Sequence, residues 1–110
     1  MVTITVNAEK GEFKVTGHAN YDKYGKDIVC ASISTCYEMI TLFIKNYKVK
    51  STIKDDDDGV YIKYDKQNKT IAIFIIAMIE PFLKKLEKEY PDYVSLIIDD
   101  KIKRNDYCYE

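Results

Sequence analysis

The longest helical pattern in the chain occupies residues 27–48, which read DIVCASISTCYEMITLFIKNYK. Apolar residues recur there three and four positions apart, as they do on the buried face of an α-helix. That row consists of Ile33, Tyr37, Ile40, Ile44 and Tyr47, with Cys36 and Phe43 beside it. Asp27 stands just before the pattern and is a residue type that caps helix N-termini. The stretch therefore predicts a long, buried helix that begins after Asp27 and ends near Tyr47 or Lys48.

Two strands are predicted before this helix. Val2, Ile4 and Val6 alternate with polar residues, and after a turn at residues 9–11 Phe13 and Val15 do the same. The two strands form an N-terminal hairpin. On this alternation His18 lies at the end of the second strand, on the face opposite Phe13 and Val15. The polar residues 20–26 predict a loop between the hairpin and the helix.

Three more strands and a second helix are expected in the rest of the chain. The strands cover residues 49–54, 60–65 and 93–98, and the acidic run 55–58 with Gly59 turns the chain between the first two. The helix covers residues 70–90, with lysines and glutamates at 84, 85 and 87–89 on its solvent face and a buried stripe of Phe74, Met78, Phe82 and Leu86. Two features oppose a continuous helix: residues 71–76 are apolar on all sides, as in a buried strand, and Pro81 interrupts a helix.

These elements predict a small α/β (α+β) protein. We expect a two-layer sandwich with a mostly antiparallel sheet, the N-terminal hairpin and two packed helices. The 110 residues suffice for one compact domain, which we place at residues 1–98, followed by a charged tail at 99–110.

The composition narrows the function classes. The 17 basic and 18 acidic side chains are nearly balanced, which disfavours a nucleic-acid partner. The longest apolar run, 71–79, is about half the length of a membrane span, and the first residues alternate like a strand rather than a secretory signal. The 3 cysteines include no CxxC pair, which disfavours a disulfide scaffold. We expect a soluble, cytoplasmic protein without a membrane partner.

Residues 17–34 carry the residue types of a catalytic site. They contain His18, the only histidine, and Cys30. With Asp27 as the cap, Cys30 is the third helical residue, where free backbone N–H groups and the helix dipole favour the thiolate, the nucleophilic form of cysteine. The same N–H groups could stabilise an oxyanion. Ser34 follows Cys30 by one turn, and Gly17 and Gly25 permit backbone shapes that would bring His18 over the helix start.

Simpler interpretations exist for the histidine and for the cysteines. A lone histidine at a strand end is more often structural or merely exposed. A buried cysteine is more often a small apolar residue, which fits Cys36, and Cys108 in the tail reads as an incidental thiol. A Cys3His zinc site is disfavoured because Cys30 and Cys36 would point about 120° apart on one helix. An EF-hand centred on Gly59 fails because Lys54 would occupy its first position and Asp65 its last. We expect no metal and no cofactor.

The motif also carries a family resemblance. The pattern Gly17-His18-Ala19, a short loop, Gly25-x-Asp27-Ile28-Val29-Cys30-Ala31 and Ser32-x-Ser34 resembles the bacterial ribosomal-processing cysteine protease family, Prp. A second helix that closes on Leu86, Glu87, Tyr90 and Pro91 is also similar to that family, and the likeness covers roughly residues 1 to 98. The resemblance implies a homodimeric cysteine endopeptidase. Its substrate would be the short N-terminal extension of a large-subunit ribosomal protein of the L-twenty-seven type, cut after two phenylalanines.

The same resemblance assigns roles to the residues that match the motif. His18 would be the general base and Cys30 the nucleophile of a Cys-His dyad. Supporting positions, for orientation or the oxyanion, are Asp27, Ala31 and Ser34. Loop residues that would meet the substrate are Gly17, Ala19, Tyr21, Tyr24 and Gly25, with the two tyrosines as candidates for an aromatic pocket. The alternative is a non-catalytic module that binds ribosomal protein, or a ribosome-assembly factor regulated by oxidation of Cys30.

Overall fold

The computed structural model describes residues 1–18, 22–23, 27–64 and 69–102, and for residues 69–77 it describes the backbone alone. Within these ranges the elements follow in the order β1 (Val2–Asn7), β2 (Glu12–Thr16), α1 (Ile28–Asn46), β3 (Ser51–Asp56), β4 (Gly59–Tyr64), α2 (Lys69–Glu89) and β5 (Val94–Ile98). The predicted order and type of these elements are confirmed, and their bounds differ from the prediction by a residue or two. Residues 71–76, which could also have formed a strand, are helical.

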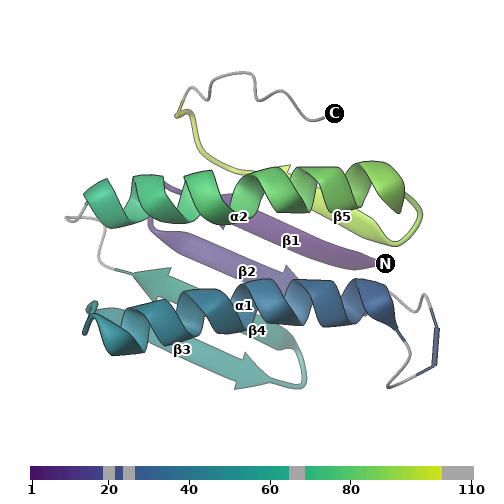
Figure 1. The fold of residues 1–110 in the computed structure, drawn as a ribbon, viewed down its shortest axis with the longest axis horizontal. Coiled ribbons are helices and arrows are strands. Elements are labelled where there is room, and N and C mark those ends of the chain that lie inside the picture. Colours follow the sequence, from purple (N-terminus) through teal and green to yellow (C-terminus); the bar gives the residue numbers. More distant parts are fainter. Residues whose placement is uncertain (19–21, 24–26, 65–68, 103–110) are drawn as a thin grey trace.

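The strands form one 5-stranded sheet in the order β3-β4-β2-β1-β5. The pairs β1–β2, β2–β4 and β3–β4 are antiparallel, and only β1–β5 is parallel. Both helices cover the same face of the sheet (Figure 1). The expected two-layer α+β sandwich with an N-terminal hairpin is therefore confirmed.

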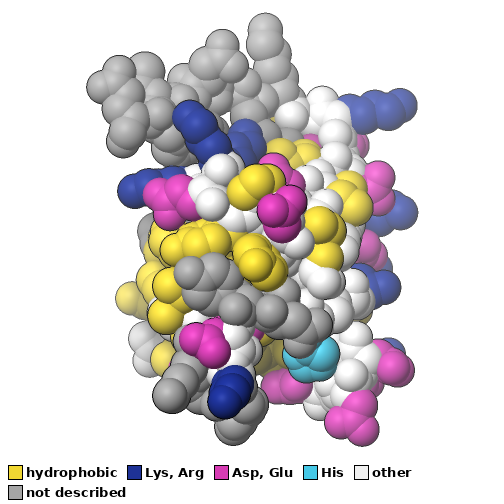
Figure 2. Space-filling model, turned by 90° about the vertical axis from the view of Figure 1, so that its right-hand side faces the viewer, with side chains coloured by type: hydrophobic (Ala, Val, Ile, Leu, Met, Phe, Trp, Pro, Cys, Tyr) yellow, Lys and Arg dark blue, Asp and Glu magenta, His cyan; other side chains and the backbone are white. Residues whose placement is uncertain are grey.

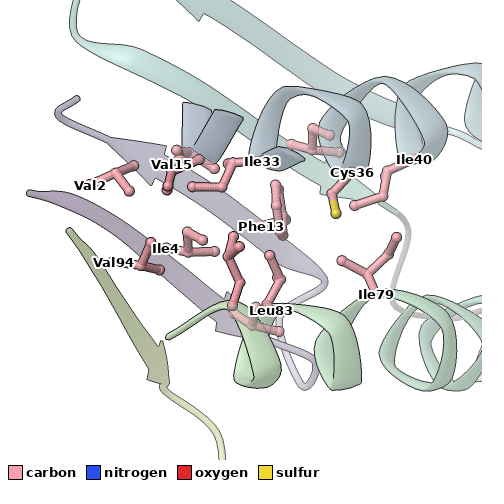
Figure 3. Close-up of a cluster of buried hydrophobic side chains, with 14 of the residues drawn as sticks. Val2, Ile4, Phe13, Val15, Ile33, Cys36, Ile40, Ile79, Leu83 and Val94 are labelled. Atoms are coloured by element: carbon pink, nitrogen blue, oxygen red, sulfur yellow. The ribbon is translucent and has the colours of Figure 1, made fainter. Parts of the chain in front are cut away.

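The core lies between the sheet and the helices. Phe13 of β2 is opposite Val6 of β1 and Ile62 of β4, so the buried residues of neighbouring strands stand in rows across the sheet. The helices cover these rows with a second set of apolar side chains: Val29, Ile33, Cys36, Ile40, Ile44, Ile79, Leu83 and Leu86. Side chains from the sheet and both helices point toward one another around Phe13 (Figure 3). Burial of this apolar surface is the main force that holds the layers together.

The predicted buried row of α1 is right at its centre and wrong at its end. Ile33, Ile40 and Ile44 are buried as expected, whereas Tyr47 is 68% exposed. The helix ends at Asn46, so Tyr47 is its C-cap and no longer follows the helical row. Its ring instead packs on the outside of the helix against Phe43, with ring centroids 4.9 Å apart.

The predicted buried stripe of α2 is displaced by one residue. Phe82 is 43% exposed and Met78 is half-buried, while Leu83 and Ile79 are buried together with the correctly predicted Leu86. Leu83 and Phe82, three and four residues before Leu86, are both its neighbours on the helix surface. The sheet covers the side of the helix that carries Leu83. The side chain of Phe74 lies outside the described residues.

Helix α2 is continuous through Pro81. A proline inside a helix removes one N–H donor, here the donor that would reach the carbonyl of Ala77, and its ring crowds that turn. Ile79 and Leu83, on either side of Pro81, are both buried in the core. We attribute the continuity of the helix to this packing against the sheet.

The outer surface of α1 is also apolar. Among the described helices, α1 alone is long and apolar enough to cross a membrane by length and composition. The same test is passed by core helices of soluble proteins, and α1 contributes Val29, Ile33 and Ile40 to the core. Its apolar character beyond this row comes from exposed side chains such as Met39 and Leu42.

The first residues of the charged tail are fastened to the domain. The Asp99 N–H donates to the Val6 carbonyl at 2.8 Å, and Asp100 Oδ2 accepts from the Ala8 N–H at 2.7 Å. The Lys101 N–H donates to Glu9 Oε1 at 2.7 Å. The chain after β5 thus continues beside the end of β1 and the hairpin turn.

The displaced stripe of α2 predicts unequal losses of stability for two neighbouring truncations. Leu83→Ala is expected to lower the free energy of unfolding by about 2–5 kcal/mol, because it leaves a cavity in a closely packed core. Phe82→Ala is expected to cost about 1 kcal/mol or less, because much of its ring already contacts water. Urea denaturation of both variants measures the difference, and a larger loss for Phe82→Ala would contradict the observed helix orientation.

Candidate active site

The two segments that carry His18 and Cys30 lie at the same end of the molecule. Strand β2 ends and helix α1 begins at the same side of the sandwich, on the right in Figure 1. Thr16, the last residue of β2, pairs with Thr3 of β1 and Gly59 of β4, which fixes the position of the strand end. His18 follows two residues later, and Cys30 is the third residue of α1.

Gly17 redirects the chain before His18. It adopts φ +79°, and a Cβ atom placed on it would lie 2.6 Å from the Met1 carbonyl oxygen. A side chain is therefore excluded by both backbone conformation and space. This confirms that Gly17 provides an unusual backbone shape, and it corrects the prediction that the strand reaches His18: β2 ends at Thr16 because Gly17 turns the chain out of the sheet. The His18 side chain is exposed, and the histidine is visible at the surface in Figure 2.

Asp27 caps α1, as predicted. Its Oδ1 atom accepts from the Cys30 N–H at 2.9 Å, and its carbonyl accepts from the Ala31 N–H at 3.0 Å. The cap occupies the backbone N–H of Cys30 itself, which is then not available to an oxyanion. The remaining N–H groups of the first turn belong to Ile28 and Val29, and within the described part of the chain neither has an acceptor.

The two cysteines of α1 lie in different environments. Cys30 is half-buried, whereas Cys36 is buried and its side chain points into the core (Figure 3). Burial raises the pKa of the Cys36 thiol above its ordinary value, which fits a structural role. Val29 is fully buried and fixes the turn that carries Cys30. The sequence prediction missed Val29, although its spacing of four residues from Ile33 is the signal that identifies it.

The other predicted site residues are placed only in part. Ala31 and Ser34 are exposed on α1, and Ser34 follows Cys30 by one helical turn. The predicted loop residues Ala19, Tyr21, Tyr24 and Gly25 lie outside the described residues. The aromatic pocket expected from the two tyrosines therefore stays a prediction.

The acidic turn between β3 and β4 lies at the same end of the molecule. Asp55 and Asp56 belong to β3, so only Asp57 and Asp58 form the turn. Gly59 adopts φ +136° and packs against the Val15 carbonyl and Thr16, next to the chain that leads to His18. The sequence predicted this run only as a solvated turn. Its position near the end of β2 results from the pairing of β2 with β4, which the local sequence does not indicate. In the described ranges, no three His, Cys, Asp or Glu side chains are grouped in a way that could hold a metal ion.

The difference in burial predicts selective modification of Cys30. In a Cys108→Ser background, iodoacetamide is expected to alkylate Cys30 roughly tenfold or more faster than Cys36, because Cys36 reacts only after the core opens. Peptide mass spectrometry over time measures both rates. In guanidinium the two rates should become similar, and similar rates in the native protein would contradict the buried position of Cys36.

The raised pKa of Cys36 predicts a pH dependence of stability. Above the ordinary pKa of 9.0, the unfolded state releases the Cys36 proton before the folded state does. The contribution of the neutral thiol is therefore complete below this pH and is lost as the pH rises toward the folded pKa. The free energy of unfolding of wild type should therefore approach that of Cys36→Ala as the pH is raised from neutral to alkaline. A difference between the two that does not change with pH would contradict the pKa direction.

Comparisons with known proteins identify the family. The model of the family described as cysteine protease Prp matches residues 1–95. The ribosomal processing cysteine protease Prp of Staphylococcus aureus, in strains Mu50 and NCTC 8325, is 33% identical over 103 residues, which cover 86% of this chain and 94% of the relative.

Solved structures show the same fold. The crystal structure of the Staphylococcus aureus ribosomal processing protease Prp with a covalently linked product peptide has a TM-score of 0.77 at 24% identity and covers 90% of this chain and 100% of that chain. The structure of SMU.848 from Streptococcus mutans has a TM-score of 0.65 at 23% identity and covers 91% and 93% of the two chains. The family match over most of the chain, the identity to the curated relatives and the shared fold agree: this chain belongs to the ribosomal processing cysteine protease family Prp.

Proposed function

We propose that this protein is the endopeptidase that removes the short N-terminal extension of a large-subunit ribosomal protein of the L-twenty-seven type, cutting after a Phe-Phe pair. Membership of the Prp family supports a cysteine protease that acts in ribosomal processing. The Staphylococcus aureus protein has been crystallised with a substrate peptide and with a covalently linked product peptide. A covalent link to a peptide is what nucleophilic catalysis by a cysteine produces.

One observation carries the assignment of residues. Cys30 is half-buried in the first turn of α1, where its backbone N–H is bound by the Asp27 cap. His18 follows β2 and Gly17 at the same end of the molecule. The first turn of a helix carries backbone N–H groups that can stabilise a negative charge developing on a bound substrate. The chain has a single histidine, so His18 is the only imidazole that this subunit can offer as a base.

The proposed mechanism uses these two side chains in turn. His18 takes the proton of Cys30, and the thiolate attacks the carbonyl carbon of the second phenylalanine. The N–H groups of Ile28 and Val29 face the oxyanion, because the cap already holds the N–H of Cys30. His18 then protonates the leaving amine, and a water activated by His18 hydrolyses the thioester.

The remaining parts of the proposal concern the surroundings of this dyad. Ala31 and Ser34 would support the first turn, and the loop with Ala19, Tyr21 and Tyr24 would meet the phenylalanines of the substrate. We propose that the enzyme is cytoplasmic, pairs as a homodimer and needs no metal or cofactor, since a thiol and an imidazole are sufficient for acyl transfer. The catalytic domain would span residues 1–98.

A cleavage assay tests the proposal. The substrate is a peptide with Phe-Phe followed by a small residue, and mass spectrometry identifies the products. Wild type is expected to cut after the second phenylalanine, and Cys30→Ala and His18→Ala are expected to lower kcat by at least about a thousandfold, because each removes half of the reacting pair. Cys36→Ala, which removes the other thiol of the same helix, serves as the matched control and should retain cleavage.

The outcomes separate the alternatives. Undiminished cleavage by Cys30→Ala and His18→Ala would show that the dyad is assigned wrongly. Cleavage of other peptides but not after Phe-Phe would overturn the substrate while the protease assignment stands. Binding of the peptide by wild type without any cutting would favour a non-catalytic ribosomal-protein-binding module.

A further inference from the structure

The outward face of α1 is unusually poor in charge for a surface helix. Opposite the buried row, its exposed residues include Ile28, Ala31, Thr35, Met39 and Leu42, and Leu42 is 63% exposed. Hydrophobic side chains gather over the helix layer on the left of Figure 2. A surface helix normally carries charged residues opposite its apolar stripe, and a contiguous exposed apolar surface marks a contact site.

The two charged residues of α1 are arranged in a self-complementary way. Glu38 and Lys45 are the only charged residues among the 19 of this helix, and both are exposed. They are seven positions apart, which is about two turns, so they lie on the same face with Leu42 between them. If two copies of α1 run antiparallel about a two-fold axis beside Leu42, Glu38 of each copy lies opposite Lys45 of the other.

We propose that a second copy of this chain packs against the C-terminal half of α1, with the two-fold axis beside Leu42. This inference rests on the homodimer proposed above and names its interface. A two-fold contact uses the same patch on both subunits and requires that the patch complement itself. The sequence of one acidic residue, one central leucine and one basic residue meets that requirement, whereas a different partner protein would not demand it.

The geometry also places the interface away from the catalytic end. With the axis beside Leu42, the helices overlap over residues 37–46 of each copy. Cys30 lies twelve residues before Leu42, which is about 18 Å along the helix. Both active sites would therefore stay open in the dimer, and a variant that separates the subunits should still fold and cleave peptides.

The test measures the oligomeric state by analytical ultracentrifugation over a range of protein concentrations. Wild type is expected to be a dimer, and Leu42→Glu should raise the dimer Kd by at least about tenfold, as for a central interface residue. Glu38→Lys and Lys45→Glu should each weaken the dimer by placing like charges opposite one another. The double variant with both changes should restore it, since the pairs are then re-formed with exchanged signs. Lys10→Glu, a charge reversal in the hairpin turn, is the matched control and should leave the dimer unchanged.

Each outcome decides the inference. A monomeric wild type at all concentrations would overturn both the pairing and this interface, whereas dimers that persist in Leu42→Glu would overturn only the interface. Equal effects of the single and double charge variants would exclude the antiparallel arrangement. Peptide cleavage by Leu42→Glu shows whether the variant is folded and reports on the proposed protease independently of the dimer.

Discussion

The hydrogen bond from the Cys30 N–H to Asp27 Oδ1 is the contact on which the rest of the site depends. It determines where α1 begins, and so which residue stands third in its first turn. A cap of this kind contributes about 0.5–2 kcal/mol to stability. The burial of Val29 in the same turn also holds the start of the helix in place. Cap and anchor together fix the direction of the helix over the sheet. The cap also occupies the Cys30 N–H, so in the proposed mechanism the oxyanion is left to other N–H groups of the first turn.

Helix α1 presents residues with different surroundings on its inner side, in its first turn and on its outward side. One row, from Val29 to Ile44, packs against the sheet, and the first turn carries Cys30 at the end of the sandwich where β2 ends. The outward row with Leu42 has no partner within the described part of the chain. The two thiols show how finely these faces are separated. Cys30 and Cys36 are less than two turns apart, yet Cys30 is half-buried in the first turn of the helix and Cys36 is buried in the core.

Much of the fold and part of the site follow from local sequence signals. Alternation in residues 2–15 predicts the hairpin, and Asp27 before an apolar helix predicts the cap, because both depend on neighbours along the chain. Phe82 and Tyr47 were misplaced because periodicity defines a helix face but not which edge of it the sheet will cover. The end of β2 at Thr16 depends on contact of Gly17 with Met1, and the position of the acidic turn depends on the pairing of Gly59 with Thr16. Such long-range contacts leave no local pattern to read.

The hydrogen bonds that follow β5 lie at one end of β1, and the contact with Gly17 lies at the other end. Asp99 and Lys101 are bound beside Val6 and Glu9, whereas the Met1 carbonyl packs against Gly17 at the other end of β1. The strand between these two points spans roughly 17 Å. An affinity tag or fluorophore joined to Met1 would therefore lie close to Gly17 and the proposed active site. Lys101 lies at the opposite end of β1, so a label joined there would lie away from the proposed cleavage site.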